Sequence, residues 1–338
     1  MSLAHVFAER PLRIYWETTR ACDLACRHCR AEAAPDRDPA ELTADEGVAL
    51  LNQLSGFGGA LPHLVLTGGD PLKRPDLFSL IAAARGLGFR VSVAPSATPL
   101  LTEDALRRLK DSGIDAISLS LDGSTAARHD ALRGIPGTYD QTLEAARTAR
   151  AIGVPFQVNT LVCAETIEDM PSIHAQVVEM GAARWSLFFL VTVGRGQVLQ
   201  PVDPARAESL LIWLAGLAVP GRAGHLVITT TEAPHFRRVV AEQRRARPAA
   251  SPAAQHDIPD GRPSAAAQGH GAGIRDGNGI LFISHTGAIC PSGFLEMPVG
   301  NVRSSNVVEV YRRHPLFESL RRPAAFGGRC GPCSYHAV

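Results

Sequence analysis

The sequence predicts an α/β protein, a partial (β/α)6 TIM-like barrel followed by a small C-terminal α+β extension. Two observations carry this prediction. Between residues 11 and 196, six short runs of apolar and β-branched residues alternate with stretches of helical periodicity, which is typical of parallel strands covered by helices. The polar motifs of this part follow the apolar runs, where such folds gather their functional residues.

The predicted strands cover residues 13–18, 64–67, 90–94, 116–121, 156–162 and 184–191, and the predicted helices cover 43–54, 75–87, 102–112, 138–152 and 171–180. Four glycines at or just after helix ends are predicted to be left-handed caps: Gly56, Gly113, Gly153 and Gly181.

The rest of the chain is less regular. Residues 197–240 are predicted to be helical with a short strand at 226–230, and 245–273 to be a flexible loop or linker, because Ala, Pro, Gly, Gln and His dominate there without periodicity. A hairpin at 279–283 and 287–289 and a helix at 307–314 follow. We therefore expect a core domain at 1–200, connecting helices and a linker at 201–273, and a C-terminal segment at 274–338.

Composition narrows the function classes. The net charge is +1 over 338 residues, so nothing indicates a nucleic-acid partner. The first ten residues form no signal peptide, and the longest apolar run, 210–219, is about half of what a bilayer requires. We expect a soluble, cytoplasmic chain without a membrane partner. Six of its seven cysteines lie in tight groups or near the C-terminus and Cys163 stands alone, a pattern that favours metal ligation over disulfides. Cys163 itself is predicted to be a small core residue.

Three cysteines follow the first predicted strand in a C-x3-C-x2-C run: Cys22, Cys26 and Cys29. A loop can wrap three such thiolates around one inorganic iron–sulfur cluster. With three protein ligands, a four-iron cluster keeps one iron open for substrate. A structural zinc site would need a fourth ligand, and His28 directly precedes Cys29 and would point elsewhere.

Two further polar motifs close predicted strands. Thr67-Gly68-Gly69-Asp70-Pro71 offers two glycines that let the backbone approach a ligand and present carbonyls to an ammonium group; a tight turn is the alternative. Ser118, Ser120 and Asp122 share one face by alternation, and buried polar atoms there need partners such as a ligand. For Asp122 and Gly123, a strand-ending turn is equally compatible.

Taken together, these motifs resemble the radical SAM superfamily. The resemblance implies a [4Fe-4S] cluster on Cys22, Cys26 and Cys29, and S-adenosylmethionine (SAM) bound at its open iron. One electron from a flavodoxin- or ferredoxin-type reductant then cleaves SAM to a 5′-deoxyadenosyl radical, which abstracts hydrogen from the substrate. Asp70 stands where the family has Glu.

The resemblance also implies a cofactor pocket. Gly68, Gly69, Asp70 and Pro71 would hold the SAM amino group, and Ser120 and Arg133 its carboxylate, as suits an Arg fork. The remaining residues of the implied pocket are Ser96 and Asn159 at the ribose or adenine, Arg195 in a pocket-closing Gly194-Arg195-Gly196 segment, and His28 and Asp122. For Arg195, a solvated loop residue is the alternative.

The C-terminal segment is similar to the SPASM or twitch extension, on Gly287-Ala-Ile-Cys290-Pro, Gly300-Asn301-Val302 and Cys330-Gly-Pro-Cys333. This implies an auxiliary iron–sulfur cluster on Cys290, Cys330 and Cys333; a zinc knuckle or two unrelated cysteine groups are the alternatives. That extension usually also has a Cys upstream of its hairpin, and its C-x2-C-x5-C run would place the next cysteine just beyond Val338. Either the sequence stops one residue short or the second auxiliary cluster has been lost. We expect at most one auxiliary cluster with three ligands.

The substrate class is predicted from the similarity of two short segments to one branch of the family. Cys26-Arg-His-Cys29-Arg-Ala-Glu32 and Ile283-Ser-His-Thr-Gly287 resemble most the branch that acts in alternative haem and d-type haem biosynthesis. A tetrapyrrole substrate is therefore predicted, with maturation of a ribosomally made peptide as the alternative. A non-catalytic electron-transfer protein is a further alternative, against which Gly68–Pro71 and the Ser120 and Arg133 motif argue. A zinc module is another, and its colourless protein would distinguish it.

Overall fold

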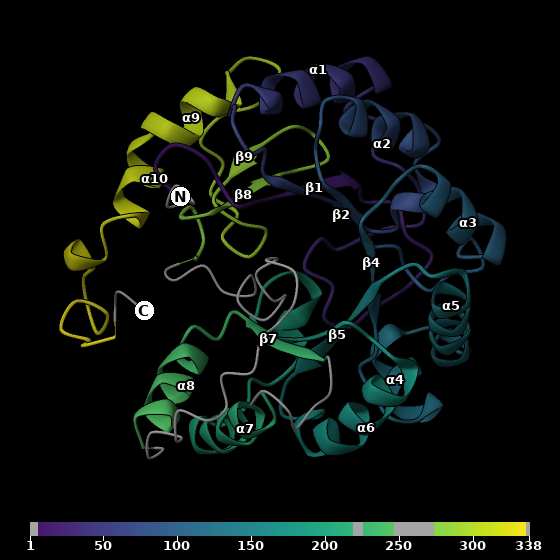
Figure 1. Ribbon diagram of the computed structural model, residues 1–338, viewed down its shortest axis with the longest axis vertical. Helices are drawn as coiled ribbons and strands as arrows, with labels where there is room; N and C mark the ends of the chain where they lie inside the picture. Colours follow the sequence, from purple (N-terminus) through teal and green to yellow (C-terminus); the bar gives the residue numbers. More distant parts are fainter. Residues whose placement is uncertain (1–5, 219–225, 247–273, 336–338) are drawn as a thin grey trace, which may run out of the picture.

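The computed structural model describes residues 6–218, 226–246 and 274–335. They form one nine-stranded sheet in the order β7-β6-β5-β4-β3-β2-β1-β8-β9, parallel except for the last pair. Its strands are β1 (Arg13–Thr19), β2 (His63–Gly68), β3 (Val91–Val93), β4 (Ala116–Ser120), β5 (Phe156–Val162), β6 (Arg184–Phe189), β7 (Val227–Thr231), β8 (Ile280–Ile283) and β9 (Ile289–Cys290). The sheet curls without closing, and helices cover its outer side (Figure 1). The predicted partial barrel is confirmed.

Alternation along each strand separates an outer, apolar face from an inner, more polar one. On β1, Ile14 and Trp16 are buried against the helices, whereas Tyr15 between them is only partly buried. The helices that form this layer and the C-terminal part are α1 (Ala44–Ser55), α2 (Leu77–Gly86), α3 (Glu103–Asp111), α4 (Ala126–Arg133), α5 (Thr138–Ile152), α6 (Met170–Met180), α7 (Pro204–Leu217), α8 (His235–Ala246), α9 (Val307–Arg313) and α10 (Pro315–Leu320).

Two local expectations differ from the structure. Helix α4, capped by Thr125 and by Gly134 at φ 75°, was not predicted. Gly56 was wrongly predicted to be a left-handed cap: its φ is −65°, and the chain turns only two residues later, at Gly58 with φ 68°. The other three predicted glycine caps, Gly113, Gly153 and Gly181, do have positive φ.

Segments beyond residue 200 extend the same sheet. Strand β7 pairs parallel with β6, and β8 pairs parallel with β1, placing Leu281 opposite Ile14. The C-terminal hairpin, β8 and β9, therefore lies directly beside the first strand (Figure 1). Most of the predicted linker at 245–273 lies outside the described residues.

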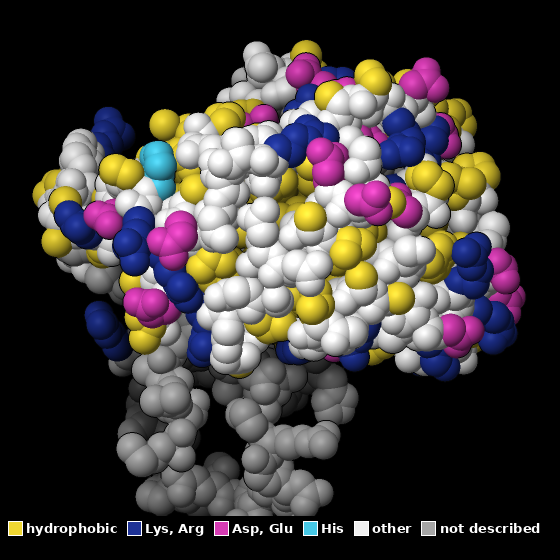
Figure 2. All heavy atoms as spheres, turned by 90° about the horizontal axis from the view of Figure 1, so that it is seen from above, with side chains coloured by type: hydrophobic (Ala, Val, Ile, Leu, Met, Phe, Trp, Pro, Cys, Tyr) yellow, Lys and Arg dark blue, Asp and Glu magenta, His cyan; other side chains and the backbone are white. Residues whose placement is uncertain are grey.

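The surface carries mixed charge. On the face seen in Figure 2, acidic and basic side chains are scattered among apolar and uncharged ones, as the net charge of +1 suggests. Among the described helices, none combines the length and apolar character needed to span a bilayer.

Candidate active site

The cysteine loop, residues 20–34, follows β1 and is attached to segments that follow three other strands. After β2, the N–H of Asp70 donates to the carbonyl of Ala21 (2.7 Å). After β4, the carbonyl of Arg133 accepts from the N–H of Ala25 (3.1 Å). After β6, the N–H of Arg195 donates to the carbonyl of Cys29 (3.0 Å). The loop is thus held at the carboxyl ends of parallel strands, where these folds carry their chemistry.

The three thiols of this loop lie in one small cluster with Leu24 and Ala33. The N–H of Leu24 donates to Cys22 Sγ and that of Ala33 to Cys29 Sγ, both at 3.4 Å. Arg133 Nη1 lies 3.7 Å from Cys26 Sγ. Burial raises the pKa of Cys22, but each sulfur faces a donor that stabilises the thiolate, the form that ligates metals.

The Gly-Gly-Asp-Pro motif makes close contacts with the protein backbone that were not predicted. A Cβ on Gly68 would lie 2.2 Å from the carbonyl oxygen of Thr19, and one on Gly69 would lie 2.4 Å from that of Ala21. Glycine is therefore required at both positions, because the motif packs closely on the backbone of Thr19 and Ala21. Pro71 begins the short 3₁₀ helix that follows the motif.

Asp70 links this motif to the segment after β3. Its carboxylate accepts from the N–H of Leu72 (3.1 Å), the N–H of Ser96 (3.3 Å) and the hydroxyl of Thr98 (2.8 Å). Burial raises its pKa in spite of these donors. The carboxylate is thus fully engaged with the protein, which explains why the shorter Asp suits this position.

Arg133, Asp122 and His28 form a buried polar group beside Cys26. Arg133 Nη2 lies 2.6 Å from Asp122 Oδ2, and the other carboxylate oxygen accepts from the N–H of Leu161 (2.7 Å). Burial acts to raise the pKa of Asp122, but Arg133, His28 and His129 outweigh it and lower that pKa. His28 Nε2 is 3.8 Å from Asp122. Burial lowers the pKa of His28 to about 4, so its imidazole is neutral near pH 7.

The predicted adenosine contacts lie on the inner side of the sheet. Ser96 Oγ donates to the carbonyl of Gly69 (2.8 Å) and lies 3.5 Å from Cys22 Sγ. Ser120 and Asn159 lie opposite each other on β4 and β5. Asn159 accepts from Gln157 (2.8 Å), while the Ser120 hydroxyl makes no hydrogen bond within the described residues.

Arg195 is not a solvated loop residue. Its Nε donates to the carbonyl of Cys26 (2.9 Å) and its Nη1 to that of Ala33 (2.8 Å). It therefore holds both ends of the turn that carries Cys29. Sequence reasoning missed Glu17 and His285, whose carboxylate and imidazole meet at 2.8 Å; the available signal was an acidic residue inside a buried strand.

The loop and its surroundings suit a polar cofactor. Within the described residues, three buried nitrogens around the loop have no hydrogen-bond partner: His28 Nδ1, Arg133 Nε and Arg195 Nη2. Unpaired buried polar groups are rare, and these three nitrogens are available to a bound group. In the same part of the chain, no three His, Cys, Asp or Glu side chains are arranged around a single metal ion; an iron–sulfur cluster distributes its thiolates over separate irons.

The C-terminal cysteines are not brought together. Cys290 is buried on β9, and its pKa is raised to about 12, first by burial and then by Glu296. Cys330 and Cys333 are exposed beyond α10, in a tail that runs away from β9 in Figure 1. The predicted auxiliary ligand set is therefore split in this structure.

A cavity of about 400 Å³ lies beside the carboxyl ends of β5, β6 and β7. Its lining combines apolar residues such as Val162, Phe189 and Leu190 with the ionisable residues Glu208, Glu232 and His235. Burial, followed by the nearby Asp276, raises the pKa of Glu232 to about 7.

Comparison with known proteins extends these observations. Residues 16–177 match the radical SAM superfamily model. An AdoMet-dependent heme synthase of Nitratidesulfovibrio vulgaris is 37% identical over 96% of this chain and 85% of its own. A PqqA peptide cyclase of Gluconobacter oxydans is 33% identical over 52% of this chain and 48% of its own. Streptococcus suis SuiB, solved with S-adenosylmethionine, has a similar fold with a TM-score of 0.72 and 18% identity, over 98% of this chain and 72% of its own.

Proposed function

Since this chain belongs to the radical SAM superfamily and is an enzyme, we propose that Cys22, Cys26 and Cys29 hold its [4Fe-4S] cluster and that its substrate is a tetrapyrrole. The observation that carries the cluster assignment is the donor beside each of the three sulfurs. When bound, the cluster supplies one electron and SAM supplies the radical that removes hydrogen from the substrate.

The residues around the loop would bind and orient SAM. Arg133 and Ser120 are proposed to bind its carboxylate, and the carbonyls of the Gly68–Pro71 motif its amino group. Ser96 and Asn159 are proposed to contact the ribose or adenine. Arg133 is held by Asp122 (2.6 Å) while its Nε has no partner among the described residues, which supports a guanidinium kept in place for a further anion.

The tetrapyrrole assignment is supported by sequence identity over the whole chain. The heme synthase of Nitratidesulfovibrio vulgaris is 37% identical over 96% of this chain, whereas a PqqA peptide cyclase of Rhodopseudomonas palustris is 26% identical over 97%. The cavity beside β5 to β7 presents Val162, Phe189 and Leu190, apolar side chains that suit the faces of a planar ring system. A flavodoxin- or ferredoxin-type protein is proposed as the electron donor.

The test is SAM cleavage with two substrate classes. Full-length protein reconstituted without oxygen is given a reductant and SAM, with either an iron porphyrin bearing propionate groups or a peptide, and 5′-deoxyadenosine and the altered substrate are measured. We expect the porphyrin to be converted, and simultaneous change of Cys22, Cys26 and Cys29 to Ala to abolish cleavage. Normal cleavage by that variant would refute the cluster assignment, and conversion of the peptide alone would refute the substrate assignment.

The auxiliary cluster stays a separate prediction, because its three cysteines lie apart in this structure. Iron and sulfide analysis decides it. As arranged here, the chain is expected to hold one cluster's worth of iron, unchanged when Cys330 and Cys333 are replaced by Ala. Two clusters' worth in the parent, and one in that variant, would show that the tail joins Cys290 when iron is present.

A further inference from the structure

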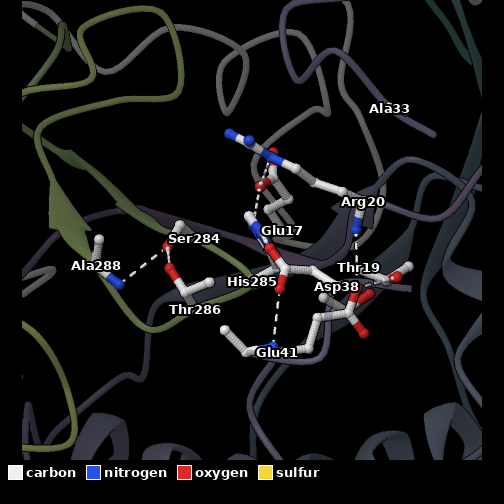
Figure 3. A network of polar contacts seen from close by, with 12 residues as sticks. Glu17, Thr19, Arg20, Ala33, Asp38, Glu41, Ser284, His285, Thr286 and Ala288 are labelled. Carbon is white, nitrogen blue, oxygen red and sulfur yellow. Dashed lines mark hydrogen bonds and ion pairs between the residues drawn. The ribbon is translucent and has the colours of Figure 1, made fainter. Parts of the chain in front are cut away.

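A buried carboxylate on β1 connects the cysteine loop to the C-terminal hairpin. Glu17 is fully buried, and an unpaired charge there would be costly. Its Oε1 accepts from His285 Nδ1 (2.8 Å) and lies 3.4 Å from Arg20 Nε (Figure 3). Its Oε2 accepts from Arg30 Nη2 (2.5 Å). Burial acts to raise the pKa of Glu17, but these partners outweigh it and bring it to about 2. The carboxylate is therefore ionised and fixed.

The partners of Glu17 come from two separate segments. Arg20 and Arg30 flank the three cysteines within the cysteine loop, and Arg30 directly follows Cys29. His285 belongs to the turn of the C-terminal hairpin, and its Nε2 also contacts Asp38 at 3.2 Å, so that the ring lies between two carboxylates (Figure 3). The buried charge of Glu17 thus connects the cysteine loop to the hairpin turn, where His285 lies 268 positions after Glu17.

Arg30 makes two more contacts with the hairpin region. Its guanidinium lies over the ring of Phe282, 4.8 Å from the centroid, and it forms an ion pair with Glu296. A Cβ on Gly293 would lie 3.1 Å from Arg30 Nε, so the segment after β9 also packs on this side chain. The residue next to Cys29 is therefore enclosed by the hairpin and by the segment that follows it.

We propose that Glu17, Arg30 and His285 are positioning residues, through which the C-terminal hairpin holds the cysteine loop in the form that retains the cluster. The proposal rests on the proposed cluster site. None of the three touches the reacting atoms. They act by fixing the backbone on both sides of the cysteines, because Glu17 binds a residue from each side of the loop as well as the hairpin.

The test measures iron retention and thiol exposure together. Anaerobically purified full-length protein is treated with a ferrous chelator and iodoacetamide, and labelling of each cysteine is followed by mass spectrometry. Cys163 is fully buried in a different cluster of the core, so its labelling reports opening of the whole fold. Electron paramagnetic resonance of the reduced protein reports the surroundings of the cluster.

We expect His285→Phe to lose iron about tenfold faster or more, the factor expected when a charge-assisted hydrogen bond is removed. Labelling of Cys22, Cys26 and Cys29 should rise with it, while that of Cys163 stays constant and the resonance spectrum changes. His285→Asn, which keeps a donor for Glu17, should recover much of the retention. Thr286→Ala is the matched control: it removes a contact to Ser284 (3.1 Å) in the same turn and leaves Glu17 untouched.

Three results would overturn the proposal: equal iron loss in His285→Phe and Thr286→Ala, an unchanged resonance spectrum, or labelling of Cys163 in step with the other thiols. If His285→Phe does not fold, Glu296→Gln decides, because it loosens only the outer partner of Arg30. It should speed iron loss about twofold, and parental retention would refute the proposal. Immediate labelling of Cys22, Cys26 and Cys29 in the parent without chelator would refute the cluster site itself. In that case, comparing the labelling rates of parent and variants would still decide whether the hairpin positions the loop.

Discussion

Asp122, Asp70 and Glu232 lie at the same edge of the sheet and differ in their partners. Asp122, after β4, is paired with Arg133 at 2.6 Å, and its pKa is lowered. Asp70, after β2, has three neutral donors, and its pKa is raised. Glu232, after β7, has no hydrogen-bond partner within the described ranges, and its pKa is raised to about 7.

The difference separates two parts of the rim. Around the cysteine loop, the carboxylates are held in place, Asp122 by a cation and Asp70 by three neutral donors. Beside the cavity at β5 to β7, Glu232 has a pKa of about 7 and makes no hydrogen bond within the described residues. A cation partner thus distinguishes Asp122, whose pKa is lowered, from Asp70 and Glu232, whose pKa values are raised by burial.

The largest effect is expected where the cation is removed. Arg133→Ala leaves Asp122 charged and buried, which should lower the free energy of unfolding by about 3–5 kcal/mol. Denaturant titration measures it. Arg128→Ala is the matched control on the same helix, because Arg128 is exposed and lies 3.4 Å from Asp169; it should change little. Equal losses in the two variants would contradict the role given to Arg133.

A smaller effect is expected at Asp70. In Asp70→Asn, an NH2 group replaces one of the accepting oxygens and faces a donor from Leu72, Ser96 or Thr98. Loss of such buried hydrogen bonds should cost about 1–3 kcal/mol in the same titration. Asp104→Asn, at an exposed position in the first turn of α3, serves as control. A cost as large as that of Arg133→Ala would show that neutral donors stabilise this rim as strongly as a cation does.

The smallest effect is expected at Glu232, and it depends on pH. Because the folded protein raises this pKa from 4.5 to about 7, the folded state favours the protonated acid. That contribution is fully present below pH 4.5 and is lost as pH rises through 7. Glu232→Gln should therefore remove on the order of 1 kcal/mol of the decline in stability between pH 5 and pH 8. The free energy of unfolding is measured by urea titration at both pH values. An equal change between pH 5 and pH 8 in parent and variant would exclude an elevated pKa of Glu232.

Much of the fold followed from local pattern. Strand β5 has the predicted bounds, 156–162, because its alternation is regular and Gly153 ends the helix before it. Helix α4 was missed because it has only eight residues, half of them polar, and its Thr125 and Gly134 caps are short signals. The pairing of β8 with β1 is non-local, and no periodicity encodes which strands become neighbours.

The site was predictable in its residue types and less so in their partners. Spacing identified the three cysteines and alternation placed Asp122 on a polar face. That Arg133 would pair with Asp122 was not predicted, since both were assigned to a cofactor. The contacts of Arg195 were out of reach, because both of its acceptors are backbone carbonyls, which any sequence provides.

The pairing of β8 with β1 also determines when the site can be completed during synthesis. Arg13 lies opposite Ile280. One edge of β1 therefore stays unpaired until almost the whole described chain has been synthesised. Contacts of such sequence separation slow folding, and an unpaired strand edge invites association with other chains. The nascent protein therefore has its three N-terminal cysteines and an open strand edge long before the hairpin has been synthesised.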